Sequence, residues 1–203
     1  MVTRELPPNS GGIGYYVYNL SKKLVERGHE VSIITRGSKA RYTRELVEGI
    51  DVIRVTFFPV YPFHIWVHGA FINTMFKSIE SKFDLVHMHS PLVPPIKTSL
   101  PIITTVHTPS KIDAKYHEVI DFFSFAERTQ SAIFYPLYES RLFSISKSIT
   151  AVSFSVAKEL RTYGLDINRI DVVRNGVDEK IFTPIANDKS RQKYVLYLSL
   201  IHI

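Results

Sequence analysis

The sequence contains no cysteine, which excludes disulfide bonds and thiolate metal sites. This absence is typical of proteins in a reducing compartment, and we expect a cytoplasmic location. The first residues carry no signal-peptide pattern, because Met1 leads directly into a strand-like segment. No Walker A motif, complete G-x-G-x-x-G motif or G-x-S-x-G nucleophile elbow occurs, so the common nucleotide-binding and hydrolase signatures are missing.

Acidic residues are fewer than basic ones, with 19 Asp and Glu against 25 Lys and Arg and a net charge of +6. This excess favours anionic partners such as phosphates, nucleotides or acidic lipids. Four of the basic side chains gather in or beside a loop predicted at 37–44: Arg36, Lys39, Arg41 and Arg44. They indicate either a solvated surface or a contact with an anionic acceptor or lipid headgroups.

Residues 55–76 contain no Lys, Arg, Asp or Glu and are rich in aromatic side chains. A membrane span is disfavoured, since Pro59 and Pro62 interrupt the segment and polar residues follow. Two interpretations stay open: a packed loop that leads into a helix at about 65–82, or an aromatic surface that contacts a membrane interface.

The clearest local pattern is a glycine-rich loop before an amphipathic helix. Residues 7–14 read PPNSGGIG, and Asn9 or Ser10 can cap the helix. Gly28 ends this helix, and its apolar residues recur on one face: Ile13, Val17, Leu20 and Leu24. A strand, a glycine loop and a helix start form a geometry that binds phosphate, although a plain tight turn has the same pattern.

The rest of the chain alternates between strand and helix patterns. Strands are predicted at 29–35, 49–56, 83–89, 101–107, 148–152 and 169–173, and helices at 121–147 (continuous or broken at Pro136) and 156–163. This alternation predicts an α/β domain, a Rossmann-like parallel sheet with helices on both faces. Ligands bind such sheets outside the carboxyl ends of the strands. Five features follow strand ends and should share that edge: Gly11-Gly12, His89, His107, Ser153 and Asn175-Gly176.

In order and spacing, the motifs of the chain resemble those of the family-4 retaining glycosyltransferases of the GT-B fold. The motifs are PPNSGGIG at 7–14, RGHEV at 27–31, DLVHMH at 84–89, TVHTP at 105–109, AVS at 151–153 and NGVD at 175–178. The resemblance covers residues 1–184. It implies two Rossmann-like domains that face each other across a cleft, the first for the acceptor and the second for the nucleotide-sugar donor. It also implies transfer of a hexosyl group with retention of configuration, without a metal or other cofactor.

The resemblance assigns roles to single residues. His107 matches the catalytic histidine beside the donor sugar, although a histidine at a strand end can also be satisfied by a backbone carbonyl. The residues expected to bind donor phosphate or acceptor are Gly11, Gly12, Gly14, His89, Ser153, Asn175 and Gly176. Asn175-Gly176 is equally consistent with a simple tight turn, and Arg174 stands where the family commonly has proline.

The histidines invite a metal interpretation, which we do not favour. His87 and His89 alternate on one strand and could bind zinc together with His107, but no carboxylate ligand is evident. The expected partners are a nucleotide-sugar donor, a lipid-linked or saccharide acceptor and an anionic membrane surface on the cytoplasmic side, and no nucleic acid.

We expect one domain, a linker and only the start of a second domain. Residues 1–182 form the acceptor-side domain, 183–193 a linker, and 194–203 the start of a donor domain that is cut short. Residues 198–203 read LSLIHI, as a translated sequencing adapter does, so we exclude them from the fold and expect this fragment to be inactive alone. Two other functions stay open: a non-catalytic module that binds an acceptor or a membrane, and a Rossmann domain like that of sugar-nucleotide epimerases.

Overall fold

The structure, a computed structural model, describes residues 1–8, 11–37, 42–60, 63–112 and 120–183. The predicted donor-domain start at 194–203 lies outside these residues, as does the predicted linker apart from Thr183.

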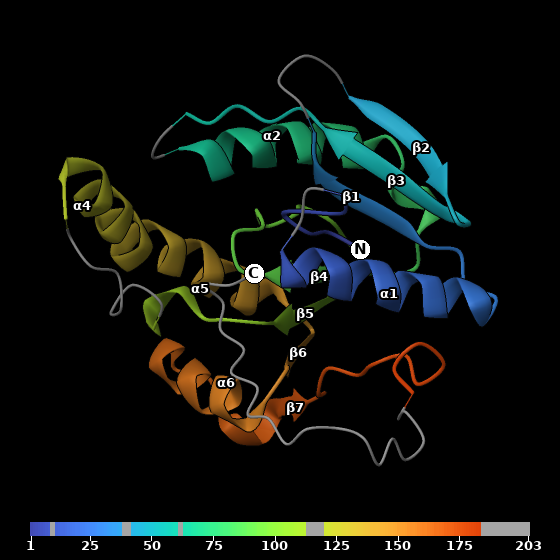
Figure 1. Cartoon of the computed structure of the whole chain (residues 1–203). Coiled ribbons are helices and arrows are strands. Elements are labelled where there is room, and N and C mark those ends of the chain that lie inside the picture. Colours follow the sequence, from blue (N-terminus) through green and yellow to red (C-terminus); the bar gives the residue numbers. More distant parts are fainter. Residues whose placement is uncertain (9–10, 38–41, 61–62, 113–119, 184–203) are drawn as a thin grey trace, which may run out of the picture.

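The strands lie side by side in a mostly parallel sheet (Figure 1). They are β1 (Ser32–Arg36), β2 (Thr43–Val47), β3 (Ile50–Val55), β4 (Val86–Ser90), β5 (Ile102–Val106), β6 (Ser148–Ala151) and β7 (Ile170–Val172). One run has the order β1-β3-β2 and the other β4-β5-β6-β7. Val2 joins the two runs, because it bridges Ile34 of β1 and Met88 of β4, both in parallel. The predicted strand at the start of the chain therefore lies in the middle of the sheet.

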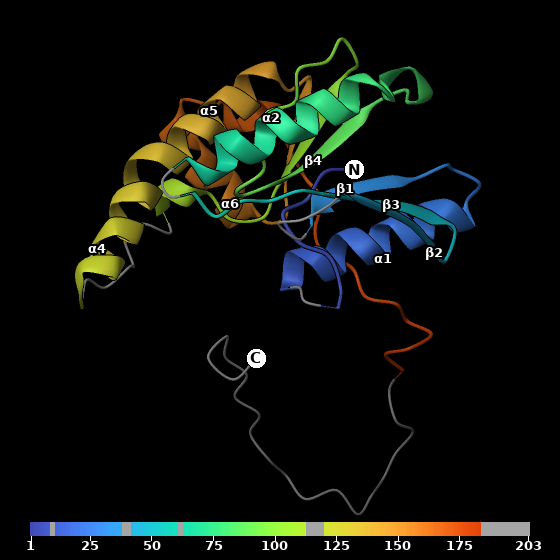
Figure 2. The ribbon, with the colours of Figure 1, turned by 90° about the horizontal axis from the view of Figure 1, so that it is seen from above.

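Helices cover both faces of the sheet, as predicted. The α-helices are α1 (Gly12–Glu26), α2 (His64–Lys77), α4 (Phe122–Thr129), α5 (Tyr135–Ile145) and α6 (Phe154–Glu159). Shorter helical segments are η1 (Glu80–Lys82), η2 (Gln130–Phe134), η3 (Leu160–Tyr163) and η4 (Ile167–Arg169). Figure 2 shows α1 on one side of the sheet and α2 and α5 on the other.

The two faces have separate cores, set by the alternation of side chains along each strand. Ile33 of β1 and Val52 of β3 pack with Val17 of α1. Their neighbours Ile34 and Ile53 face the opposite way and pack with α2 and α5 in a larger cluster. Figure 1 shows α6 beside β6 and β7, against which it packs.

One strand contradicts the predicted loop at 37–44. Thr43 and Arg44 belong to β2, which pairs antiparallel with β3 and makes the sheet mixed. A two-residue turn joins these strands, with φ of 50° at Glu48 and 80° at Gly49. Positive φ at both positions matches the turn that best suits the twist of a hairpin. The strand was missed because four of its five residues are exposed, so it carries no apolar alternation.

The predicted helix at 121–147 forms without a break at Pro136. It consists of α4, the π-helical segment η2 and α5, and Pro136 lies in the first turn of α5, where proline is tolerated. Across the described ranges, we find no helix with the length and apolar composition needed to cross a bilayer.

Candidate active site

The glycine loop ends at the start of α1. Gly11 is the N-cap residue and has no side chain with which to cap the helix; the predicted caps Asn9 and Ser10 lie outside the described residues. The Gly11 N–H donates to Glu5 Oε1 at 3.0 Å, so this helix start holds an anion supplied by the chain itself. A Cβ on Gly11 would lie 2.8 Å from that oxygen, whereas a Cβ on Gly12 would meet open space. Gly14 is buried in the first turn.

Two histidines meet at the carboxyl ends of β4 and β5. His89 is fully buried, and its Nδ1 lies 3.4 Å from Nε2 of the half-buried His107. The backbone N–H of His107 donates to the Ser90 carbonyl at 3.1 Å, and this bond fixes the chain just after β5. His87, on the same face of β4, contacts Thr105 Oγ1 through its Nε2 at 2.7 Å.

Tyr16 of α1 connects the glycine loop to these histidines. Its ring centroid lies 4.8 Å from that of His107 and 5.8 Å from that of His89, both in edge-on geometry. Helix α1 thus packs on the two histidines, although Tyr16 and His107 are about ninety residues apart in the sequence. The structure sets helix α1, which begins at the glycine loop, against His89 and His107, and the roles of these residues stay predictions.

The histidines of this cluster are uncharged at neutral pH. Burial lowers the pKa of His107 from 6.5 to about 4 and that of His87 to about 4 as well. Burial also places the pKa of His89 well below its ordinary value, and the His89 Nε2 has no hydrogen-bond partner. A neutral imidazole carries one donor and one acceptor nitrogen, so His107 is equipped for hydrogen bonding rather than for holding a charge. Within the described parts of the chain, no three His, Cys, Asp or Glu side chains are grouped to hold a metal ion.

The other predicted site residues lie further along the same sheet. Ser153 caps α6, with its Oγ accepting from the Val156 N–H at 3.2 Å. Asn175 and Gly176 are exposed and follow β7. Two residues later, Asp178 pairs with Lys23 of α1 at 3.1 Å, so the chain after β7 returns toward α1. The roles of these residues stay predictions.

A buried glutamate beneath the histidines was missed by the sequence analysis. Glu139 of α5 accepts from Ser90 Oγ at 3.1 Å and from Ser110 N and Oγ at 3.0 Å each, and the Tyr163 hydroxyl also donates to it. Burial raises the pKa of this carboxyl, and the hydrogen bonds oppose that shift. Ser90 follows His89 and Ser110 lies close after His107, so Glu139 ties both histidine segments to α5. The available signal was that Glu139 is the only acidic residue between Glu127 and Glu159.

A small cationic cavity opens beside the same edge. It has a volume of about 170 Å³, and its described lining contains no acidic residue. Besides Thr3 and several apolar residues, it is lined by Arg4, Arg36, His64 and His68. The Arg36 guanidinium lies 5.7 Å from the Phe57 ring centroid. Arg44, from the same predicted basic group, instead pairs with Asp51 at 2.6 Å, while Lys39 and Arg41 lie outside the described residues. Arg4 and Arg36 form no ion pair with a described carboxylate, so this cavity suits an anion.

Comparison with known proteins agrees with this geometry. Residues 10–180 match the sequence model of Glycosyltransferase Family 4. Among curated proteins, D-inositol 3-phosphate glycosyltransferase of Xylanimonas cellulosilytica is 28% identical over 195 residues, covering 87% of this chain and 45% of that protein. The Phosphatidylinositol N-acetylglucosaminyltransferase GPI3 subunit of Saccharomyces cerevisiae (strain YJM789) is 35% identical over 80 residues, covering 39% of this chain and 16% of the subunit. This chain therefore spans about half the length of the inositol-phosphate relative.

Among solved structures, sucrose-phosphate synthase from Thermosynechococcus elongatus superposes with a TM-score of 0.66 at 17% identity. The match covers 91% of this chain and 49% of that one. At this identity the likeness concerns the fold alone.

Proposed function

The chain belongs to glycosyltransferase family 4, and we propose that it is the acceptor-side domain of an enzyme that transfers a sugar from a nucleotide-sugar donor to an anionic acceptor with retention of configuration. The family match favours this function over that of an epimerase-like domain. Because the chain spans 45% of the length of its inositol-phosphate relative, the proposal assigns donor binding mainly to another part of the whole protein.

The contact of Tyr16 with His89 and His107 carries the proposal, because it sets helix α1, which begins at the glycine loop, against the histidines at the carboxyl edge of the sheet. The amide of Gly11 already binds a carboxylate oxygen of Glu5. A diphosphate oxygen of the donor would bind the same helix start and would share or displace Glu5.

In this proposal, transfer breaks the bond between C1 of the sugar and the diphosphate oxygen. The acceptor hydroxyl oxygen forms the new bond to C1, and its proton goes to the departing diphosphate. Backbone amides aimed at the leaving group stabilise the charge that it gains. Neutral His107 contributes a hydrogen bond to a sugar hydroxyl, since its low pKa leaves it uncharged.

The cavity lined by Arg4 and Arg36 supports an acceptor that carries a phosphate. A guanidinium group binds phosphate oxygens well, and neither Arg4 nor Arg36 pairs with a described carboxylate. Relatives named for inositol 3-phosphate and for phosphatidylinositol make an inositol phosphate the first acceptor to try.

The test uses the whole protein that contains this chain, incubated with nucleotide sugars and an inositol phosphate. We expect His107→Ala to lower kcat roughly tenfold, as the loss of one hydrogen bond would, whereas the matched variant His29→Ala, at an exposed histidine outside the site, keeps the wild-type rate. Arg36→Gln should raise the KM for the phosphorylated acceptor and leave that for the donor unchanged. The product's anomeric configuration, read by NMR, should equal that of the donor. Full activity in His107→Ala would remove this histidine from the mechanism, and an inverted product would refute retention.

A further inference from the structure

The connection between the parallel neighbours β4 and β5 is unusual because it contains no helix. Parallel strands normally need a crossover of a dozen or more residues, usually with a helix. Here residues 91–101, all described, make the crossover without a helix. Val93 and Ile96 of this connection are buried, and they pack in the same cluster as Met88 of β4 and Ile102 of β5. The connection thus seals the sheet with a layer thinner than a helix.

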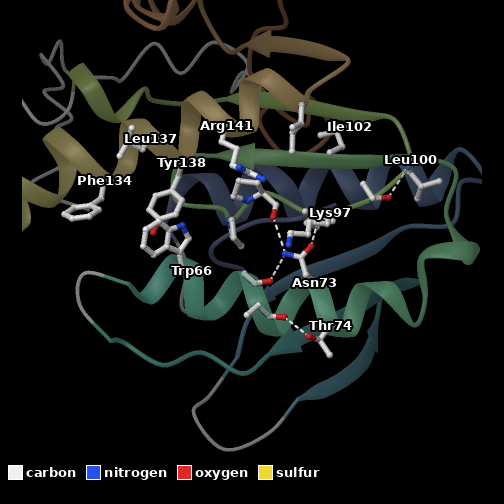
Figure 3. A pocket seen from close by; sticks show the side chains of 17 residues that line it. Trp66, Asn73, Thr74, Lys97, Leu100, Ile102, Phe134, Leu137, Tyr138 and Arg141 are labelled. Atoms are coloured by element: carbon white, nitrogen blue, oxygen red, sulfur yellow. Dashed lines mark hydrogen bonds between the residues drawn. The ribbon is translucent and has the colours of Figure 1, made fainter.

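A groove follows from this thin layer. It lies between α2 and α5, outside the 91–101 connection, and has a volume of about 890 Å³. Figure 3 shows side chains of α2 and α5 facing each other across it. Asn73 holds one wall, since its amide nitrogen donates to the Gly69 and Pro95 carbonyls at 2.7 and 3.3 Å. The groove lies on the α2–α5 face of the sheet, whereas His89 and His107 contact α1 on the other face.

One end of the groove is aromatic and open to solvent. Trp66 is 56% exposed and Leu137 is 63% exposed. The Trp66 ring lies 5.4 Å from that of Tyr138, edge-on, and Figure 3 shows Phe134 at the same end. Tyr138 is 6% exposed, yet its buried hydroxyl has no hydrogen-bond partner. Burying an unpaired hydroxyl is unfavourable, so a ligand oxygen that reaches this group gains a hydrogen bond.

The middle of the groove is cationic. Among the described residues, Lys97 and Arg141 are the only charged ones that line it, and neither pairs with a described carboxylate. Glu80 does not line the groove, and its carboxylate accepts hydrogen bonds from Thr98 and Ser99. Two positive charges without a described carboxylate partner thus lie beside polar residues such as Asn73 and Thr98, and apolar residues continue toward Trp66. This combination matches a ligand with an anionic head and an alkyl tail.

We propose that this groove binds an anionic phospholipid of a bilayer, with its phosphate on Lys97 and Arg141 and an acyl chain along the apolar wall toward Trp66. The Tyr138 hydroxyl donates to an oxygen of the lipid. Exposed Trp66 and Leu137 then enter the membrane interface, where tryptophan is favoured. The site would hold the chain at a membrane surface independently of sugar transfer, so it does not depend on the proposed catalytic function.

Trp66 is the only tryptophan of the chain, and its fluorescence reports on the groove directly. The experiment adds vesicles of phosphatidylcholine, or of phosphatidylcholine mixed with phosphatidylglycerol, to the 203-residue chain. We expect a blue shift of Trp66 emission with the anionic vesicles only, and quenching when their acyl chains are brominated. Arg141→Gln and Lys97→Gln should each weaken vesicle binding roughly fivefold. The matched variant Arg161→Gln removes an exposed charge on η3, outside the groove, and should bind like the wild type.

Other results would overturn the proposal. Equal weakening by Arg161→Gln would mean that net charge alone attracts the chain to the vesicles. Anionic vesicles that bind without quenching by brominated chains would place the lipid outside the groove. A concentration-dependent blue shift without vesicles, accompanied by a dimer in light scattering, would make a second copy of the chain the occupant. Tyr138→Phe keeps the ring while removing the hydroxyl, so unchanged vesicle binding in that variant would exclude the proposed lipid contact of this hydroxyl.

Discussion

Several side chains at the sheet edge are held by residues from distant elements. His107 packs against Tyr16 of α1, and the segments around His89 and His107 both bond to Glu139 of α5. Each contact restricts a group that the proposed chemistry needs in one orientation. The Glu139 carboxylate accepts from two serines and a tyrosine, so its loss leaves buried donors without an acceptor.

Glu139→Gln tests this arrangement at the residue scale. The Gln amide nitrogen cannot accept, so at least one donor at Ser90, Ser110 or Tyr163 loses its bond. We expect the free energy of unfolding to fall by about 2 kcal/mol, measured by urea denaturation. Glu179→Gln, at an exposed glutamate, serves as the control and should change little. Equal stability of the two variants would show that Glu139 has no structural role.

At the scale of elements, the helices carry a recognisable sequence pattern, whereas the exposed edge strand of the sheet does not. The glycine loop and the apolar face predict helix α1 from the sequence, and Val17 on that face is buried. Strand β2 has no comparable pattern, because it lies at an edge and both of its faces meet solvent. Its only local signal is the turn at Glu48-Gly49, whose backbone requires positive φ at both residues.

Gly49→Ala tests the importance of that turn. An alanine at φ of 80° is strained, and its Cβ would lie 3.0 Å from Val25 Cγ1 of α1. We expect a loss of about 1–2 kcal/mol in the free energy of unfolding. Gly12→Ala is the comparison: its Cβ has open space at the start of a helix, so thermal stability should stay the same or rise slightly. If Gly49→Ala unfolds at the wild-type temperature, the hairpin tolerates a side chain at this turn.

At the scale of the whole molecule, the buried histidines couple folding to pH. Their folded-state pKa values lie below the ordinary 6.5, with His87 and His107 at about 4. Between pH 4 and pH 6.5, these histidines are protonated in the unfolded chain but remain neutral in the folded chain. The contribution of these neutral histidines to the free energy of unfolding is therefore fully present above pH 6.5 and is lost as the pH falls toward 4.

His87→Gln measures the share of one histidine in this loss. Gln keeps a polar group near Thr105 Oγ1 but takes up no proton. The free energy of unfolding of the wild type should fall more steeply between pH 6.5 and 4 than that of the variant, by up to about 3 kcal/mol in total. Chemical denaturation at a series of pH values gives both curves. Parallel curves would show that His87 titrates normally in the folded chain.

The sequence by itself determined the α/β class, most element positions and the residues that end the parallel strands. These are properties of local periodicity and turn chemistry, so a single stretch of chain suffices to reveal them. It also allowed His89 and His107 to be placed at a common edge, because parallel strands align their carboxyl ends.

Only the tertiary structure decided which groups meet. It inserted Val2 between β1 and β4, set Tyr16 on the two histidines and placed Glu139 beneath them. It also left a groove where the β4–β5 crossover has no helix. Such contacts join residues that are distant in the chain, and they depend on strand order and packing. No local pattern carries that information, because the same segment can pack against many partners until the whole sheet has formed.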